Sequence, residues 1–309
     1  MFYPQIIVFL LVAADMALGG LISNGFIATV IIKEWTKCRS LASNEQLLLS
    51  LGISNICAVI LQTASTITEY MVSFRNQLIL PVIFFFAFFV TFFRFWLTAW
   101  LSVFYYIKIV NSPHSLFLWC KMRISWLIHR LLIGSLVISL LISFLIFHKI
   151  LLQLQSDISA NITNKTQEKT LRATIGSSKV LFLVTGTVCP FLVVLFCSIL
   201  SVVFLCRHVR RMTTEKSSFR SLQTEAHIKA AWTVLFLLFA YVLFYVGETL
   251  VLTTDLGGKQ SFVIFLIMLY SPAQAAIFVL VNPKLKWAAT QILLRISQKQ
   301  CKCTVCSHI

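Results

Sequence analysis

The stretch from Trp96 to Ile109, WLTAWLSVFYYIKI, closes the third of seven long apolar segments in the chain. The first charge, Lys108, comes at its end, where a helix leaving the membrane is expected to meet water. Such a helix either transmits a ligand-dependent shift along its length or only packs between its neighbours. Its bulky side chains recur at the spacing of one helical face, at Trp96, Trp100, Val103 and Ile107.

The composition places the chain in a membrane, because 59% of the 309 residues are hydrophobic and only 12% are charged. No repeat or second domain is visible in the sequence, so we expect an all-α membrane protein, one seven-transmembrane helix bundle over residues 1–309. Seven runs are long enough to cross about 30 Å of hydrocarbon. We predict helices at about 6–32, 47–72, 79–107, 128–147, 180–205, 230–252 and 261–281, with a tail at 282–309.

The distribution of charge predicts how the bundle is oriented. The net charge is +16, and Lys and Arg are concentrated in the segments that lie inside if the amino terminus is outside. Two glycosylation sequons, at Asn161 and Asn164, fall in a loop that the same arrangement places outside. We therefore expect a plasma-membrane protein with an extracellular amino terminus. Its basic inner loops would meet membrane lipid, and we expect no nucleic-acid partner.

Among the polar residues inside the apolar segments are Asn24, Asn55 and Arg94. A charge in the middle of the membrane costs about 2.5 kcal/mol or more, so Arg94 is expected to face the interior of the bundle. We predict an interior polar network in which Arg94 bonds Asn55 and Asn24. The alternative is that Arg94 reaches a water-filled pocket and contacts ligand.

Glu248 is the sharpest candidate for a ligand contact. It shares one face of the sixth segment with Tyr241, Phe244 and Tyr245. Its carboxylate pairs either with a cationic ligand or with Lys259 or Lys179 at the rim of the bundle.

Several motifs resemble those of the type 2 bitter taste receptors. They are LSVFYYIKI at 101–109, LFLWCKMR at 116–123, His208 followed by Met212, HIKA at 227–230 and NPKLK at 282–286. Relatives usually have Arg where this chain has Asn55, and we hypothesise that Arg94 supplies that cation from the third helix. The family fold implies a short amphipathic eighth helix after the seventh span.

The resemblance implies a G-protein-coupled receptor that binds small bitter agonists and activates a heterotrimeric G protein of the gustducin or inhibitory class. Basic side chains at the inner ends equally set topology and meet anionic lipid. The implied pocket in the outer half would be lined by Thr66, Glu69, Tyr70, Ala87, Phe88, Thr91, Tyr241, Phe244, Glu248 and Phe265. For G-protein coupling we choose Tyr105, Lys108, His208, Arg211, Met212 and His227.

Other classes fit the sequence less well. The type 1 vomeronasal pheromone receptors share the seven helices, but the ends of the third and seventh helices favour bitter receptors. Transporters and channels tend to show paired interior charges or repeats, whereas this chain has one central Arg. No catalytic or metal-binding set lies at a common depth, so we expect no enzyme, cofactor or metal. The tail thiols are expected to be palmitoylated or free, at Cys301, Cys303 and Cys306.

Overall fold

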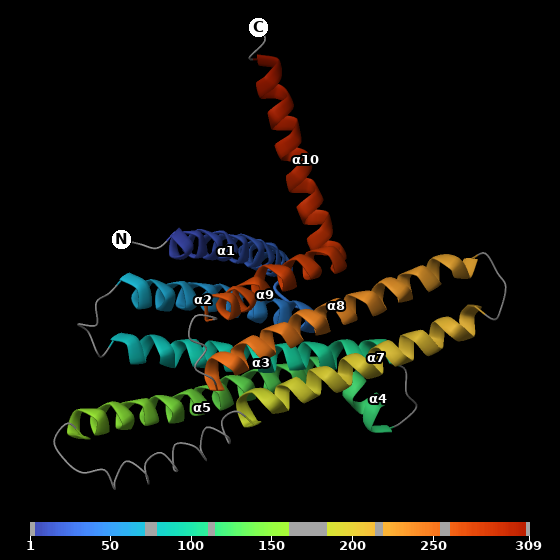
Figure 1. Cartoon of the computed structure of the whole chain (residues 1–309). Helices are drawn as coiled ribbons and strands as arrows, with labels where there is room; N and C mark the ends of the chain where they lie inside the picture. Colours follow the sequence, from blue (N-terminus) through green and yellow to red (C-terminus); the bar gives the residue numbers. More distant parts are fainter. Residues whose placement is uncertain are drawn as a thin grey trace.

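The computed structural model describes residues 4–71, 79–110, 115–160, 184–213, 219–253 and 260–306, and these are almost entirely helical. Seven helices in this part of the chain are long and apolar enough to cross a membrane, which confirms the predicted seven-helix bundle. They lie side by side in Figure 1. Their bounds are α1 Pro4–Cys38, α2 Ser43–Met71, α3 Ile79–Ile109, α5 Ile124–Ala160, α7 Cys189–Thr213, α8 Phe219–Thr253 and α9 Gln260–Val281.

Most helices extend beyond the predicted apolar runs, whereas α7 begins at Cys189, later than the predicted 180. The fourth span was expected to end near 147, yet α5 continues to Ala160, and α8 begins at Phe219 instead of near 230. Hydropathy marks the length that the hydrocarbon covers, whereas the backbone stays helical into the polar flanks. The two sequon residues, Asn161 and Asn164, lie outside the described residues.

Two short elements were not predicted. A π-helical turn, η1 (Val184–Val188), leads directly into α7. The helix α4 (Ser115–Met122) precedes α5, and the backbone of Arg123 continues the turn between them. Its N–H donates to the carbonyl of Trp119 at 3.1 Å, and its own carbonyl accepts from Leu127 N–H at 3.0 Å. Figure 1 shows α4 bent away from the axis of α5, so the two helices form an elbow.

The third span is the centre of the packing, because α3 contacts α2, α5 and α7. The helix α1 lies against α2 and α9, and α8 lies between α7 and α9. Three buried clusters fill the interior of the described bundle, and the two largest are described here. One is built around Leu47, Leu101 and Leu285, and the other around Phe95 and Phe244. The end of the bundle where α3 stops and α10 (Pro283–Cys306) begins is called here the α10 end.

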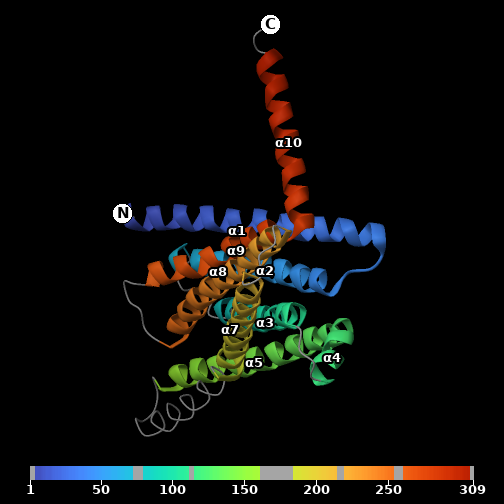
Figure 2. The same ribbon diagram turned by 90° about the vertical axis from the view of Figure 1, so that its right-hand side faces the viewer.

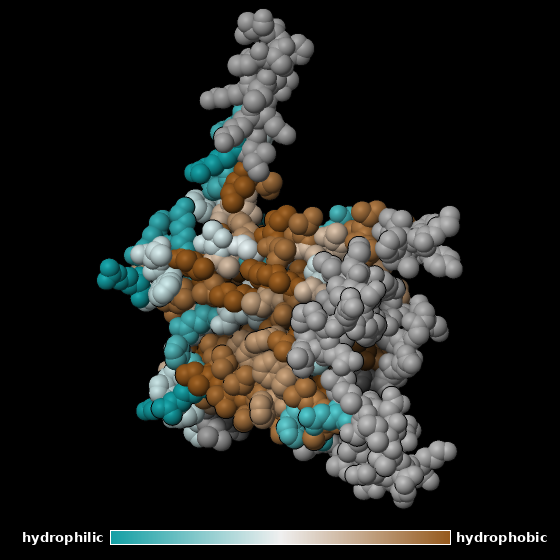
Figure 3. All heavy atoms as spheres, turned by 90° about the vertical axis from the view of Figure 1, so that its left-hand side faces the viewer, coloured by the Kyte–Doolittle hydropathy of each residue, from teal (hydrophilic) through white to brown (hydrophobic). Residues whose placement is uncertain are grey.

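The predicted eighth helix is present as α10, but its 24 residues make it much longer than expected. In both Figure 1 and Figure 2 it stands away from the bundle, across the direction of the spans. Figure 3 shows hydrophilic and hydrophobic residues side by side at its base. Trp287 and Leu293 are highly exposed, and Lys286 is exposed as well, so the described part of the helix carries both apolar and basic side chains on its surface.

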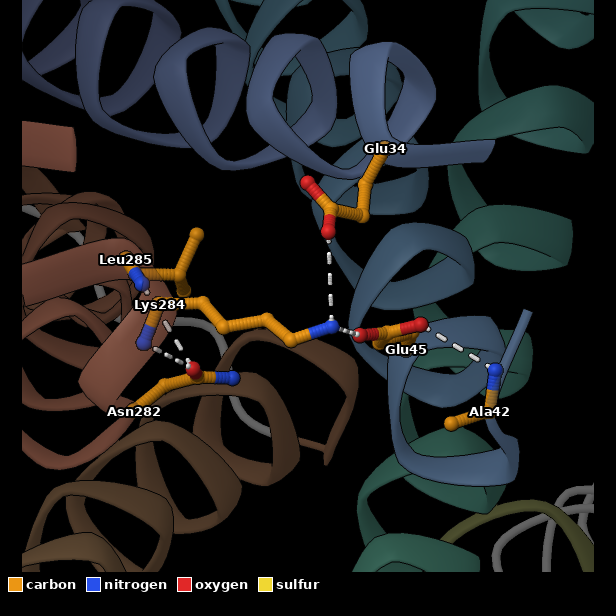
Figure 4. Close-up of polar contacts among 6 residues, drawn as sticks. All are labelled: Glu34, Ala42, Glu45, Asn282, Lys284 and Leu285. Carbon is orange, nitrogen blue, oxygen red and sulfur yellow. Dashed lines mark hydrogen bonds and ion pairs between the residues drawn. The ribbon is translucent and has the colours of Figure 1, made fainter. Parts of the chain in front are cut away.

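The first turn of α10 is fastened to the start of α2 (Figure 4). Asn282 Oδ1 caps the helix by accepting from the backbone N–H of Lys284 at 3.0 Å. Lys284 Nζ donates to Glu45 Oε1 at 2.8 Å and lies 3.7 Å from Glu34 Oε1. The hydrogen bond to Glu45 and the charge of Glu45 raise the pKa of Lys284. Glu45 also caps α2, since its Oε2 accepts from Ala42 N–H.

Candidate functional site

A chain of hydrogen bonds at the centre of the bundle joins four helices. Arg94 on α3 is only 2% exposed, and its Nε donates to Asn55 Oδ1 on α2 at 2.9 Å. Asn55 Nδ2 donates in turn to Asn24 Oδ1 on α1 at 2.9 Å. The same amide group donates to Gln274 Oε1 on α9 at 3.0 Å. The structure therefore brings together Asn24, Asn55 and Arg94, although Arg94 reaches Asn24 through Asn55 and not by the direct bond that was predicted.

Three members of this network on α9 were missed by sequence reasoning. Asn24 Nδ2 donates to Ser271 Oγ at 3.0 Å, and Gln274 Nε2 donates to the hydroxyl of Tyr270. Ser271 and Gln274 are polar side chains on neighbouring turns of an apolar span. This pattern is the feature of the sequence from which they could have been identified as network members. Their pairing with α1 and α2 depends on how the helices pack, which periodicity alone does not give.

Aromatic rings complete the surroundings of Arg94. Its Cζ lies 4.7 Å from the ring centroid of Phe244 and 5.4 Å from that of Tyr270. These two rings stack on each other with centroids 4.3 Å apart. A guanidinium over aromatic faces in a dry interior gains about 2 kcal/mol or more, which offsets part of the cost of burying the charge. Arg94 thus links α3 to both α8 and α9.

The charge of Arg94 is not neutralised by a direct ion pair with any residue that the structure describes. Its Nη2 has no hydrogen-bond partner among them. Glu248, half-buried on α8 one turn beyond Phe244, is the acid whose charge acts on Arg94. Glu248 itself forms no ion pair within the described part of the chain, and both alternative partners, Lys259 and Lys179, lie outside it.

Apart from Glu248, the predicted ligand-lining residues divide into three groups. Phe88, Tyr241 and Phe244 belong to one aromatic cluster, with Tyr241 and Phe244 each 1% exposed. Ala87 and Thr91 on α3 and Phe265 on α9 are half-buried outside that cluster. The third group lies on the last turns of α2, and its side chains fall outside the description: Thr66, Glu69 and Tyr70.

A narrow pocket opens between α3, α7, α8 and α9 on the side of Tyr241 toward the α10 end. Its lining includes Thr98, Tyr105, Ser198, Ser201 and Gln274. The buried hydroxyl of Tyr241 borders it without a hydrogen-bond partner among the described residues. The ligand pocket predicted from the sequence belongs to the half of the bundle opposite the α10 end. The pocket described here is therefore a different one, and the ligand pocket stays a prediction.

The residues chosen for G-protein coupling gather at the α10 end. Tyr105 lines the pocket just described, and Lys108 is exposed with its Nζ 5.2 Å from the ring centroid of Phe104. The remaining four lie on the last turns of α7 or the first turns of α8, with side chains outside the description: His208, Arg211, Met212 and His227.

A bundle of seven membrane-length helices tied at its centre by one polar network has the architecture of a G-protein-coupled receptor. The sequence profile of the taste receptor protein (TAS2R) family matches residues 1–297. The chain is 30% identical to taste receptor type 2 member 7 of Gorilla gorilla gorilla, covering 90% of this chain and 89% of that receptor. It is 28% identical to taste receptor type 2 member 8 of Pongo pygmaeus, over 95% and 97%. The chain therefore belongs to the type 2 taste receptor family, the bitter taste receptors.

Proposed function

We propose that this chain is a bitter taste receptor of the plasma membrane, with its amino terminus outside, forming one seven-helix domain. It binds small bitter compounds in the half of the bundle opposite α10 and activates a gustducin-type or inhibitory heterotrimeric G protein. Membership of the family supports the ligand class and the coupling. The observation that carries the mechanism is the contact of Arg94 with Phe244 and Tyr270, because it joins the proposed ligand side to the central network.

Agonist enters beside Glu248, Tyr241 and Phe244 on α8. A ligand that moves the ring of Phe244 also moves a group in direct contact with the Arg94 guanidinium, 4.7 Å away. Arg94 bonds Asn55 on α2, and Asn55 bonds α1, so these hydrogen bonds hold α3 to α1 and α2. A shift of α8 therefore changes the packing of α8 against α3. The network thus keeps α1, α2 and α3 in place while α8 moves relative to them.

The G protein is engaged at the α10 end by Tyr105, Lys108, His208, Arg211, Met212 and His227. Movement of α7 and α8 past α3 changes the pocket that Tyr105 shares with Ser198 and Ser201. The basic residues attract the acidic surface of a G protein, and the same charges hold this end at anionic lipid.

Coupling is tested with the full chain in lipid nanodiscs mixed with purified heterotrimers. We expect agonist to accelerate nucleotide exchange on a gustducin-type heterotrimer and not on a stimulatory one. Exchange that ignores agonist on every heterotrimer would contradict the proposal. Orientation has its own test, since Asn161→Gln with Asn164→Gln removes a glycosidase-sensitive mass shift only if that loop faces outside.

A further inference from the structure

Two tryptophans and two arginines form a stripe across the elbow between α4 and α5. Trp119, Arg123, Trp126 and Arg130 follow one another at the spacing of one helical face, and all four are exposed. We call these four residues the elbow stripe. Arg130 Cζ lies 4.0 Å from the ring centroid of Trp126, and Arg123 Cζ lies 5.8 Å from that of Trp119. Each guanidinium is thus held beside an indole ring.

The elbow stripe continues a face of α5 that points away from the bundle. Beyond Arg130, the same face carries four apolar side chains that are 48–60% exposed: Ile133, Val137, Leu141 and Phe144. In a membrane protein, such a face meets lipid tails. The membrane-length part of α5 begins at Ile124, so Arg130 lies about 9 Å along it. An arginine at this position reaches back to the headgroups, as its long side chain permits.

The elbow stripe lacks a neutralising carboxylate within the described part of the chain. The segment from Ser115 to Leu152 contains neither Asp nor Glu. Neither Arg123 nor Arg130 forms an ion pair with a residue that the structure describes. A guanidinium presents two parallel N–H groups that match two oxygens of a phosphate, and the desolvated lipid boundary strengthens that bond.

We propose that the elbow stripe is a binding site for the phosphate headgroup of an anionic phospholipid. Arg123 and Arg130 bind the phosphate oxygens. The indole rings of Trp119 and Trp126 hold the two guanidinium groups at the depth of the headgroups. The site rests on the orientation proposed above, which puts the elbow in the inner leaflet, where acidic lipids lie. A lipid fits better than a G protein, because Arg130 stands on the face of α5 that meets lipid tails.

The site is tested by native mass spectrometry of the full chain released from detergent with defined lipids. The probes are phosphatidylserine, phosphatidylinositol bisphosphate and phosphatidylcholine. We expect Arg123→Gln with Arg130→Gln to weaken retention of the two anionic lipids on the order of tenfold and to leave phosphatidylcholine unchanged. Trp126→Leu, which keeps both charges, should weaken it by roughly threefold.

The matched control is Lys33→Gln with Lys37→Gln, which removes two exposed charges at the same end of the bundle. Control retention within roughly twofold of the unmodified chain supports the site. An equal loss in both pairs, or no loss in the arginine pair, overturns it. Full displacement by free inositol phosphate at equal concentration also overturns it, since the site would then bind soluble phosphate.

Two further outcomes distinguish lipid binding at the elbow stripe from G-protein binding there and from an error in the proposed orientation. If the arginine pair keeps its lipid but loses G-protein activation, the stripe is a protein surface and the proposal fails. Detergent exposes both ends of the bundle, so a wrong orientation leaves lipid retention intact and appears only in the glycosidase test. Equal thermal unfolding of all variants shows that each one is folded.

Discussion

Arg94 on α3 and Asn55 on α2 are joined by a hydrogen bond of 2.9 Å that is closed to solvent, with the two residues 2% and 1% exposed. The side-chain amide of Asn55 also donates hydrogen bonds to Asn24 and Gln274. Asn55 therefore connects Arg94 on α3 to both α1 and α9. The cation in this network lies on the third helix.

Replacing Arg94 should destabilise the receptor. In Arg94→Ala, Asn55 Oδ1 loses a charged donor in a dry interior, at a cost of roughly 1.5–3 kcal/mol. We expect a marked fall in surface labelling, and we expect Asn55→Arg added to Arg94→Ala to restore it by supplying a guanidinium from α2. Arg94→Lys, which keeps the charge but not the planar fork, should fall between. Failure of the double variant to recover would show that the position of the cation, and not only its presence, is required.

Glu248 should select cationic agonists. The change Glu248→Gln keeps the size of the side chain and removes its charge, one turn from Phe244. The concentration for half-maximal response should rise on the order of tenfold for agonists with an ammonium group and stay constant for neutral agonists. Dose–response curves on matched surface expression measure this, with Glu248→Asp as the charge-preserving control. An equal rise for both ligand types would assign Glu248 a structural role.

Gly186 in η1 has no room for a side chain. A Cβ there would lie 2.7 Å from Cε1 of Phe92, a ring that is itself buried. We expect Gly186→Ala to lower the unfolding free energy by about 1–3 kcal/mol, because the ring or the turn must move. Gly134→Ala is the control, since a Cβ there would meet no other described side chain within 4 Å, and it should be neutral or slightly stabilising. Thermal unfolding in detergent compares the two, and equal behaviour would contradict the packing of η1 on α3.

The contact between Lys284 and Glu45 should be sensitive to alkali. Its hydrogen bond and charge raise the pKa of Lys284 above the usual 10.5. The stabilisation is therefore complete below about pH 10.5 and is lost as the pH rises through the higher folded value. The difference in melting temperature between the unmodified chain and Lys284→Gln should stay constant from about pH 7 to 9.5 and shrink above 10.5. Lys286→Gln, at an exposed lysine on the same turn, should show no such trend. A difference that persists undiminished at the highest pH would contradict the ion pair.

The sequence predicted the seven spans well because apolar runs of membrane length are a strong signal. Polar residues stand out within such runs, so they could also be singled out from the sequence. It did not predict α4, since Ser115–Met122 is too short to span and its helix depends on the turn at Arg123. Ser271 and Gln274 were missed because their partners lie on other helices. The facing of side chains across helices depends on packing, which a periodic pattern leaves open.

The proposed response of this chain to bitter compounds is tested most directly by measuring intracellular calcium in cells that express it with a chimeric G protein. A panel of bitter compounds is applied to cells with confirmed surface receptor. We predict a dose-dependent rise for at least some compounds that disappears when the chimeric G protein is omitted. Silence across a broad panel, with the receptor present at the surface, would contradict this function.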